Sequence, residues 1–168
     1  MINTTSLDTP LGLMIAGVMD DRICLLEFND PDRLPAQMSA LQRAFGCPVV
    51  PDEQPLHRCL QEQLEAYFTG RRRTFSLPLL VQGSEFQEKV WQALLEIPYG
   101  ERRAYAEIAR QIGAPAAARA VGTANGRNRL AILIPCHRVV NTGGALGGYG
   151  GGLWRKQWLL DLEKRYNT

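Results

Sequence analysis

The sequence lacks an apolar run long enough to cross a membrane. Its 168 residues contain no hydrophobic stretch approaching the roughly 20 residues that a bilayer requires. Residues 1–10 also lack the basic start and apolar core of a secretory signal peptide. We therefore expect a cytoplasmic protein without a membrane partner.

Cysteine pairs at metal-binding spacing are absent as well. The four cysteines, Cys24, Cys47, Cys59 and Cys136, include no CxxC pair, which argues against a zinc ribbon and against a disulfide scaffold. His57 and Cys59 are two residues apart near the start of an expected helix, so they point to different sides. We expect no metal and no cofactor. We interpret Cys24, Cys47 and Cys59 as small buried or half-buried hydrophobic residues.

Acidic and basic residues are divided unequally between the two halves of the chain. Residues 1–82 have 7 Lys and Arg against 10 Asp and Glu, whereas residues 83–168 have 12 against 7. Seven arginines fall between residues 101 and 140, where only two acidic residues occur. A basic half indicates contact with a polyanion such as nucleic acid, although a solvated arginine-rich face would have the same composition.

The first 82 residues predict a small α/β domain with a structural role. Apolar runs indicate strands, helical spacing of apolar residues indicates helices, and clusters of proline and glycine indicate loops. The expected elements are strands within residues 2–30 with a hairpin turn at 20–22, a helix at 34–45, a loop at 46–55, a helix from 56 that Gly70 closes, and a short strand at 74–81.

The expected domain boundary lies at Gln82 and Gly83. Ser84 followed by Gln87 has the form of a capping box, in which each residue satisfies a backbone N–H of the other. We therefore expect a helix from Ser84 to about residue 97, which opens the second domain.

Two short helices separated by a glycine form the next expected unit. The first covers residues 105–112 and ends at Gly113. Pro115 then opens a second helix at 116–125, which consists almost entirely of small residues around one large side chain, Arg119. This order is typical of a helix-turn-helix, whose second helix is presented to DNA. Alanine-rich helix pairs also pack inside ordinary bundles, so the pattern alone leaves both interpretations open.

A thiol and an imidazole are adjacent in the stretch IPCHRV at residues 134–139. Pro135 removes a backbone donor and so ends regular pairing just before Cys136 and His137. A cysteine held beside a histidine is a simple route to a thiolate nucleophile. A buried structural cysteine beside an incidental histidine would give the same dipeptide.

Residues 143–152 contain seven glycines around Tyr149. No GK[ST] follows them and no βαβ unit surrounds them, which excludes a Walker A loop and a dinucleotide fingerprint. We interpret the segment as a wall at which backbone groups approach a flat ligand, with a flexible connector as the alternative. A last helix is expected over residues 153–165, with Trp154 and Trp158 available for packing and Glu163 near its end.

The second half of the sequence closely resembles the methylated-DNA–protein-cysteine methyltransferases, also called alkylguanine-DNA alkyltransferases. The resemblance covers about residues 83–168. It rests on RAVG at 119–122 with Asn128, IPCHRVV at 134–140, GYGGGL at 148–153, and Lys156, Trp158, Leu159, Leu160 and Glu163. The first 82 residues resemble the variable N-terminal domain of that family only in length and in two motifs, TPLG at 9–12 and YFTG at 67–70.

The resemblance implies a fold, a reaction and a partner. The fold is an α/β N-terminal domain over residues 1–82, ribonuclease-H-like with a small antiparallel sheet, and a mostly α C-terminal domain over residues 83–168 with a winged-helix-like helix-turn-helix. The reaction is DNA repair, in which Cys136 irreversibly takes an alkyl group from the 6-oxygen of guanine, and in the wider case from O-4 of thymine. The partner is double-stranded DNA, bound by a monomer through its minor groove with the damaged base flipped out.

The resemblance also implies a role for each site residue. Cys136 accepts the alkyl group, His137 acts on it through a water molecule, and Glu163 orients His137. Asn128 ties the turn between the recognition helix and the active-site strand, while Tyr105 promotes base flipping and donates a proton to the base. The expected DNA-contacting residues are Arg119 as an intercalating finger, Tyr105, Ala118 and Thr142. The expected pocket residues are Val139, Tyr149, Gly150, Asn125 and Pro135.

Three positions depart from the family pattern. Arg129 and Ala131 stand where many members have proline, and Asn125 stands where a larger apolar residue can pack on the base. Without the proline rings we expect the wall opposite Cys136 to be less fixed and roomier. These departures affect the range of accepted alkyl groups and leave the reaction class unchanged.

Two other function classes fit parts of the sequence. A Cys-His hydrolase would need an oxyanion hole and a substrate cleft, and the arginine excess between residues 101 and 140 counts against it. A non-catalytic protein that binds alkylated DNA would have the helix-turn-helix, but such alkyltransferase-like proteins lack the cysteine. Cys136 and its flanking motifs therefore favour the transferase.

Overall fold

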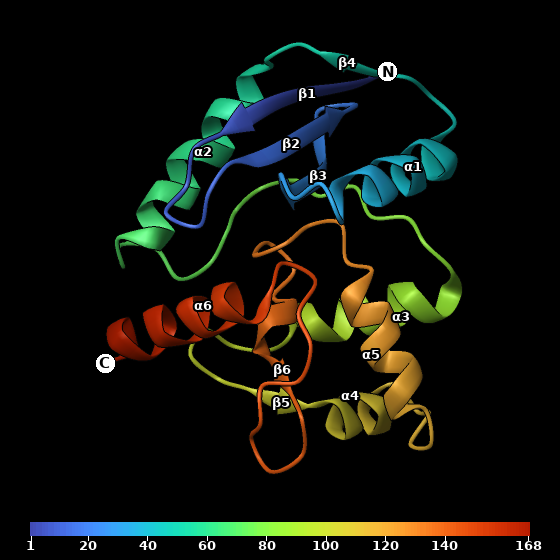
Figure 1. The fold of residues 1–168 in the computed structure, drawn as a ribbon, viewed down its shortest axis with the longest axis vertical. Coiled ribbons are helices and arrows are strands. Elements are labelled where there is room, and N and C mark those ends of the chain that lie inside the picture. The colour runs from blue at the N-terminus through green and yellow to red at the C-terminus, as the bar shows by residue number, and fades with distance from the viewer. The chain divides into compact units, whose positions relative to one another are not determined.

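The chain forms two compact units, Met1–Gln82 and Gly83–Thr168, in a computed structural model that describes residues 1–168 (Figure 1). The division falls between Gln82 and Gly83, where the sequence predicts the domain boundary. No helix of either unit combines the length and the apolar character that a membrane span requires.

The helices and strands of each unit are short. The first unit contains β1 (Ile2–Leu7), β2 (Met14–Met19), β3 (Arg22–Phe28), α1 (Leu34–Phe45), β4 (Val49–Pro51) and α2 (Pro55–Phe68). The second unit contains α3 (Glu85–Leu95), β5 (Arg103–Ala104), α4 (Tyr105–Gln111), α5 (Ala118–Gly126), the 3-10 turn η1 (Cys136–Arg138), β6 (Val139–Val140) and α6 (Leu153–Tyr166).

A four-stranded mixed sheet in the order β3-β2-β1-β4 forms the first unit. The predicted hairpin joins β2 to β3, and Asp20 and Asp21 both adopt positive φ in its turn, as the tight turns of twisted hairpins require. β4, in contrast, pairs in parallel with β1 inside the predicted loop at residues 46–55. The prediction of a loop throughout that segment is therefore wrong, because three residues are too few to produce an alternating pattern. The small sheet is mixed, with two antiparallel pairs as expected and this one parallel pair.

The predicted strand at residues 74–81 does not form. Its backbone makes an isolated bridge to the outer edge of β3, with Ile23 N–H donating to Pro78 O and Leu80 N–H donating to Ile23 O, both at 2.8 Å. Pro78 has no N–H of its own, so the bridge cannot extend into a ladder. The segment nevertheless covers an edge that would otherwise be exposed.

Both helices of the first unit follow their predicted apolar spacing. α1 packs against β3 and α2 packs against β2, and Leu41, Leu60 and Leu64 are buried at these contacts. At the end of α2, Gly70 has φ +77° and the next N–H, of Arg71, donates to Ala66 O at 2.8 Å. This is the glycine closure that the sequence predicts.

His57 has a structural role in α2. Its Nδ1 accepts the N–H of Gln54 at 2.9 Å, so its Nε2 carries the hydrogen and faces Ala16 O at 3.2 Å. Burial lowers the pKa of His57, which favours this neutral form. Cys59, two residues on, is exposed, whereas Cys24 is buried and Cys47 is half-buried. The prediction of a partly buried cysteine is thus wrong for Cys59.

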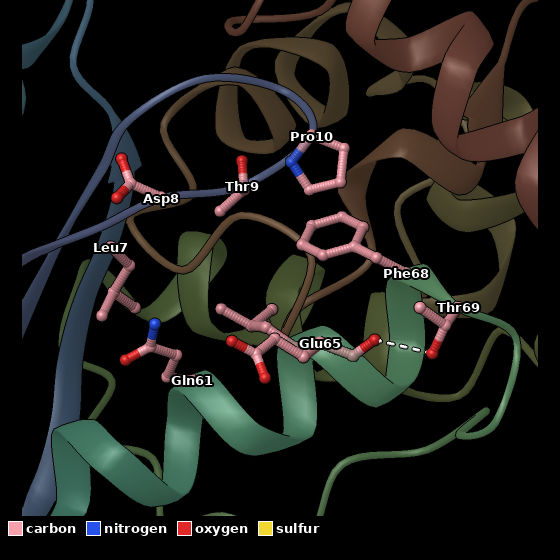
Figure 2. A pocket seen from close by; sticks show the side chains of 9 residues that line it. Leu7, Asp8, Thr9, Pro10, Gln61, Glu65, Phe68 and Thr69 are labelled. Carbon is pink, nitrogen blue, oxygen red and sulfur yellow. Dashed lines mark hydrogen bonds between the residues drawn. The ribbon is translucent and has the colours of Figure 1, made fainter.

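The two short motifs of the first unit meet at a small hollow between α2 and the β1–β2 connection. Figure 2 shows the Phe68 ring lying next to Pro10, and Thr69 Oγ1 donates to Glu65 O at 2.9 Å. The hollow has a volume of about 130 Å³, whereas pockets for small molecules enclose roughly 300–1,000 Å³. We therefore assign TPLG and YFTG to packing and not to substrate binding.

In the second unit, α3, α4 and α5 pack on one another and α6 packs against η1. The predicted capping box begins α3, since Gln87 N–H donates to Ser84 Oγ at 3.1 Å and Ser84 N–H donates to Gln87 Oε1 at 3.0 Å. Gly113, at φ +79°, makes the turn between α4 and α5. The predicted helix-turn-helix is confirmed, with α5 beginning two residues later than expected.

Short pairings and one exposed tryptophan complete the second unit. Arg103 pairs with Val139 and Ala104 with Val140 in the parallel pair β5–β6, which joins the start of α4 to the segment after Cys136. Trp154 of α6 is 58% exposed and lies against the Arg155 guanidinium. Trp154, which the sequence offered for packing, is therefore largely exposed.

Candidate active site

The segment leading to Cys136 is a compact turn and not a strand. Asn128 closes it, because its Nδ2 donates to Leu130 O at 3.3 Å and to Ile134 O at 2.9 Å, while its Oδ1 accepts the N–H of Leu130 at 2.9 Å. Ile132 has φ +72°, a conformation that a β-branched residue rarely adopts. Asn128 therefore has the tying position expected of it, but the predicted active-site strand is absent.

Cys136 is the first residue of η1 and is only 6% exposed. Its N–H donates to Ile134 O at 2.7 Å, and its carbonyl accepts the Asn125 Nδ2 hydrogen at 3.3 Å. The cysteine is thus held on both sides by the turn and by the end of α5. A substrate atom must be brought into the protein to reach it.

His137 and Glu163 form a buried pair directly after Cys136. The distance between His137 Nε2 and Glu163 Oε2 is 2.6 Å, and the side chains are 0% and 1% exposed. An ionised carboxylate can only accept hydrogen bonds, so Nε2 must carry the hydrogen. The lone pair of neutral His137 is then on Nδ1, which is buried and has no hydrogen-bond partner within the protein.

Arg138 stabilises the ionised form of Glu163. Its Nε donates to Oε1 at 2.8 Å and its Nη2 donates to Oε2 at 3.0 Å, in the bidentate geometry that suits a carboxylate. Gly100 N–H adds a further hydrogen bond to Oε1 at 3.1 Å. Burial alone would raise the pKa of Glu163, but the hydrogen bonds from His137 and Arg138 and the positive charge of Arg138 hold that pKa well below its usual range.

The same surroundings keep His137 neutral. Burial is the main cause that lowers the pKa of His137, and the positive charges of Arg138 and Lys156 add to it. Glu163 opposes the shift but does not reverse it. The residue after Cys136 is therefore a neutral imidazole whose unprotonated Nδ1 can accept a proton.

A buried lysine ties the glycine-rich segment to this site. Lys156 Nζ donates to Leu146 O and to Gly148 O, and it lies 5.8 Å from the centre of the Tyr105 ring. Burial, and to a lesser degree the charge of Arg102, lower the pKa of Lys156 to about 8, while the charge of Cys136 acts in the opposite direction. Lys156 thus anchors the glycine-rich segment at two of its carbonyls.

Tyr105 stands at the start of α4, next to that wall. Its hydroxyl lies 3.5 Å from Gly148 O, and its ring is half-buried. Burial, followed by the charge of Cys136, raises the pKa of Tyr105. The phenol therefore keeps its proton at neutral pH and can use it to donate a hydrogen bond.

The other predicted site residues lie around this cluster with different exposures. Val139 and Pro135 are buried on either side of η1, Asn125 is buried near the end of α5, and Tyr149 is half-buried. Gly150 and Thr142 are exposed, as is Arg119 on α5, with half-buried Ala118 at the start of that helix. The last four residues lie outside the hydrogen-bonded cluster of Cys136, His137, Arg138 and Glu163.

The whole chain matches known proteins. Its residues 2–81 match a family model described as the ribonuclease-like domain of 6-O-methylguanine DNA methyltransferase, and residues 85–165 match the DNA binding domain of the same family. A methylated-DNA–protein-cysteine methyltransferase of Mycolicibacterium paratuberculosis is 47% identical over 169 residues, which cover 99% of this chain and 95% of that protein. This chain belongs to the 6-O-methylguanine DNA methyltransferase family.

Further relatives agree with that assignment. A constitutive methylated-DNA–protein-cysteine methyltransferase of Bacillus subtilis is 44% identical, with 95% of this chain and 94% of that protein covered. The crystal structure of Mycobacterium tuberculosis OGT in complex with DNA is similar with a TM-score of 0.84 and 42% identity, and covers 98% of this chain and 94% of that one. The likeness extends over both units of the alkyltransferase fold.

Two residues of the alkyltransferase site were not assigned a role from the sequence. The family motifs include Arg138 and Lys156 without indicating a role for either. Both are buried; Arg138 binds Glu163, and Lys156 binds the carbonyls of Leu146 and Gly148. A signal for Lys156 exists in α6, where Lys156, Leu159, Leu160 and Glu163 are spaced so that they share one face. A charged residue on an otherwise apolar helix face indicates an internal partner.

Arg129 holds the segment that lacks the family's proline rings. Its guanidinium lies 5.6 Å from the centre of the Trp91 ring, and Trp91 Nε1 donates to Ala124 O at 2.9 Å. All residues from Leu130 to Ile134 are buried. The contact between Arg129 and Trp91 thus holds the start of the buried segment that leads to Cys136, where many family members have a proline ring.

Replacing Arg138 by methionine tests the buried ion pair. In Arg138→Met the Glu163 carboxylate stays buried without its cation, so we expect the free energy of unfolding to fall by about 3–5 kcal/mol. The matched control is Arg103→Met, which removes a more exposed pair with Glu101 at 3.0 Å and should cost at most about 1 kcal/mol. Urea unfolding at neutral pH measures both, and equal costs would contradict an ionised, buried Glu163.

Proposed function

We propose that this protein repairs DNA by transferring a methyl or larger alkyl group from the 6-oxygen of guanine to Cys136. Family membership supports the class of reaction. One observation supports the acceptor: His137, which follows Cys136 directly in the chain and is oriented by the Glu163 carboxylate, has a buried Nδ1 without a hydrogen-bond partner. O-4-alkylthymine is a second candidate substrate within the same chemistry.

The proposed reaction is a nucleophilic displacement at the alkyl carbon. A water molecule between the thiol and His137 Nδ1 would carry the thiol proton to the imidazole, which leaves a thiolate. The sulfur then forms a bond to the alkyl carbon as the bond from that carbon to the 6-oxygen breaks. The electron pair of the broken bond moves into the guanine ring, whose N1 must gain a proton to give normal guanine.

Tyr105 and Lys156 support the two charges that develop. A positive charge near a cysteine favours its thiolate, and Lys156 interacts with the charge of Cys136. The Tyr105 phenol keeps its proton and is suited to donate a hydrogen bond to the base as negative charge moves onto it. Tyr105 would pass its proton to N1 and regain one from the His137 imidazolium through water, so the proton that leaves the Cys136 thiol ends on guanine.

The product limits each protein molecule to one reaction. Alkylation of Cys136 gives a thioether, which lacks a labile bond to oxygen or sulfur. A second displacement would require another nucleophile aligned with that carbon. His137 Nδ1 is proposed to accept the proton of the thiol and not to attack the carbon. We therefore propose a stoichiometric transferase with no recovery of the thiol.

DNA is the proposed partner of the second unit. Arg119, Ala120 and Thr123 of α5 are exposed, as is Arg127 at the C-cap of the helix. The small side chains between the two arginines would let the helix approach DNA closely while both cations meet phosphates. We propose that α5 enters the minor groove and that Arg119 fills the space of the flipped base, with Ala118, Thr142 and Tyr105 near the backbone. A monomer in the reducing cytoplasm, which keeps Cys136 as a thiol, would suffice.

Intact-mass measurement tests the transfer itself. The full-length protein is mixed with duplex DNA that contains one O6-methylguanine, and we expect the mass of the protein to rise by one methyl group. Cys136→Ser should show no increase, because its hydroxyl is a much weaker nucleophile than a thiolate. Unchanged mass with retained DNA binding would contradict the proposal and favour a non-catalytic binding protein, and repeated turnover would favour a hydrolase.

The finger role of Arg119 is tested by comparing duplex and free-base substrates. In Arg119→Ala we expect methyl transfer from duplex DNA to slow by about tenfold or more, because base flipping costs a few kcal/mol and loses its support. Transfer from free O6-methylguanine, which needs no flipping, should remain unchanged. Arg110→Ala, an exposed arginine on α4, is the charge-matched control, and an equal slowing in both variants would leave only a general charge effect.

A further inference from the structure

Asn125 lies at the end of α5 with one half of its side chain unsatisfied. The residue is 4% exposed, and its Nδ2 donates to the Cys136 carbonyl at 3.3 Å. Its Oδ1 is also buried but has no hydrogen-bond partner in the protein. A buried carboxamide oxygen next to the reactive cysteine is therefore an acceptor in need of a donor.

The orientation of this carboxamide is determined by its neighbour. The Cys136 carbonyl can only accept a hydrogen bond, so the nitrogen of Asn125 must face it. The opposite orientation would set two acceptor oxygens against each other. Oδ1 is consequently fixed one carboxamide width from the backbone of Cys136.

Asn128, three residues later, shows that the fold can satisfy a buried asparagine here. Its Nδ2 donates to two carbonyls and its Oδ1 accepts a backbone N–H at 2.9 Å. Buried polar atoms without partners are rare in proteins and are frequent at functional positions. The contrast with Asn128, together with the hydrogen bond from Asn125 to the Cys136 carbonyl, points to a ligand for Asn125 Oδ1.

We propose that Asn125 Oδ1 accepts a hydrogen bond from the exocyclic 2-amino group of the alkylated guanine, which makes Asn125 a specificity-determining residue. The inference rests on the proposed function and names the base that the site selects. Guanine is distinguished by this amino donor at C2. An O-4-alkylated thymine has no amino group at the corresponding position.

This hydrogen bond would favour guanine lesions over thymine lesions. A site with a buried acceptor rejects an analogue that lacks the donor, because the acceptor is then left unpaired. Asn125 would also hold the Cys136 carbonyl through Nδ2, so one side chain positions the acceptor residue and reads the base. An apolar residue at this position could only pack on the base.

The test compares two substrates that differ only in the 2-amino group. Single-turnover methyl transfer is measured with duplexes that contain O6-methylguanine or O6-methylhypoxanthine, for the wild-type protein, Asn125→Leu and the smaller Asn125→Ala. We expect wild type to react about tenfold faster with O6-methylguanine, and this ratio to fall to within about threefold in either variant. Structural damage would slow both substrates equally and leave the ratio unchanged.

Three results would overturn the inference, and one of them concerns the proposed function. Equal slowing with both substrates in the variants would assign Asn125 a purely structural role, for example holding an internal water. An absence of discrimination by wild type would show that the 2-amino group is not read. No transfer from O6-methylguanine to wild type would instead refute the proposed function, which distinguishes the two failures.

Discussion

The active site of this protein depends on a single buried carboxylate. Glu163 accepts hydrogen bonds from the His137 ring, from two nitrogens of Arg138 and from the backbone of Gly100. A carboxylate is costly to bury unless it is paired and fully hydrogen-bonded, and this one is. Its ionised state fixes the hydrogen of His137 on Nε2 and leaves Nδ1 unprotonated, as the proposed activation of the Cys136 thiol requires.

The elements around the site position the residues that contact this carboxylate or its partners. α6 brings Glu163 and Lys156 to one face, and Lys156 in turn holds the carbonyls of Leu146 and Gly148. η1 places Cys136, His137 and Arg138 in succession, so that the proposed nucleophile, the proposed base and the counter-ion of Glu163 come from three consecutive residues. The first unit contributes a mixed sheet and a separate buried carboxylate, Glu27, which pairs with Arg33 at 2.7 Å.

Local features of the fold could be predicted from the sequence. The capping box of Ser84 and Gln87, the turns at Gly70 and Gly113 and the apolar spacing of α1 and α2 depend on neighbouring residues, and all were confirmed. β4 was missed because it is short. The strand at residues 74–81 was predicted on apolar content, but Pro78 prevents a ladder.

Long-range parts of the site were harder to predict for a physical reason. Arg138 and Glu163 are 25 residues apart, and no local pattern records their pairing. In α6 the buried face includes Arg155, Lys156 and Glu163, so apolar periodicity could not show which way Trp154 points. The grouping of Cys136, His137 and Glu163 came from the family resemblance, and the structure supplied the charge on Glu163 and the tautomer of His137.

The most direct test of this account is the single-turnover rate of methyl transfer by Glu163→Gln, measured from neutral to alkaline pH beside wild type. We expect the variant to be at least tenfold slower at neutral pH, because the His137 tautomer is no longer fixed, and to recover as hydroxide replaces the imidazole as the base. DNA binding measured in parallel shows that the variant is folded. A folded variant that transfers the methyl group at the wild-type rate at neutral pH would contradict the claim that Glu163 prepares His137 to activate Cys136.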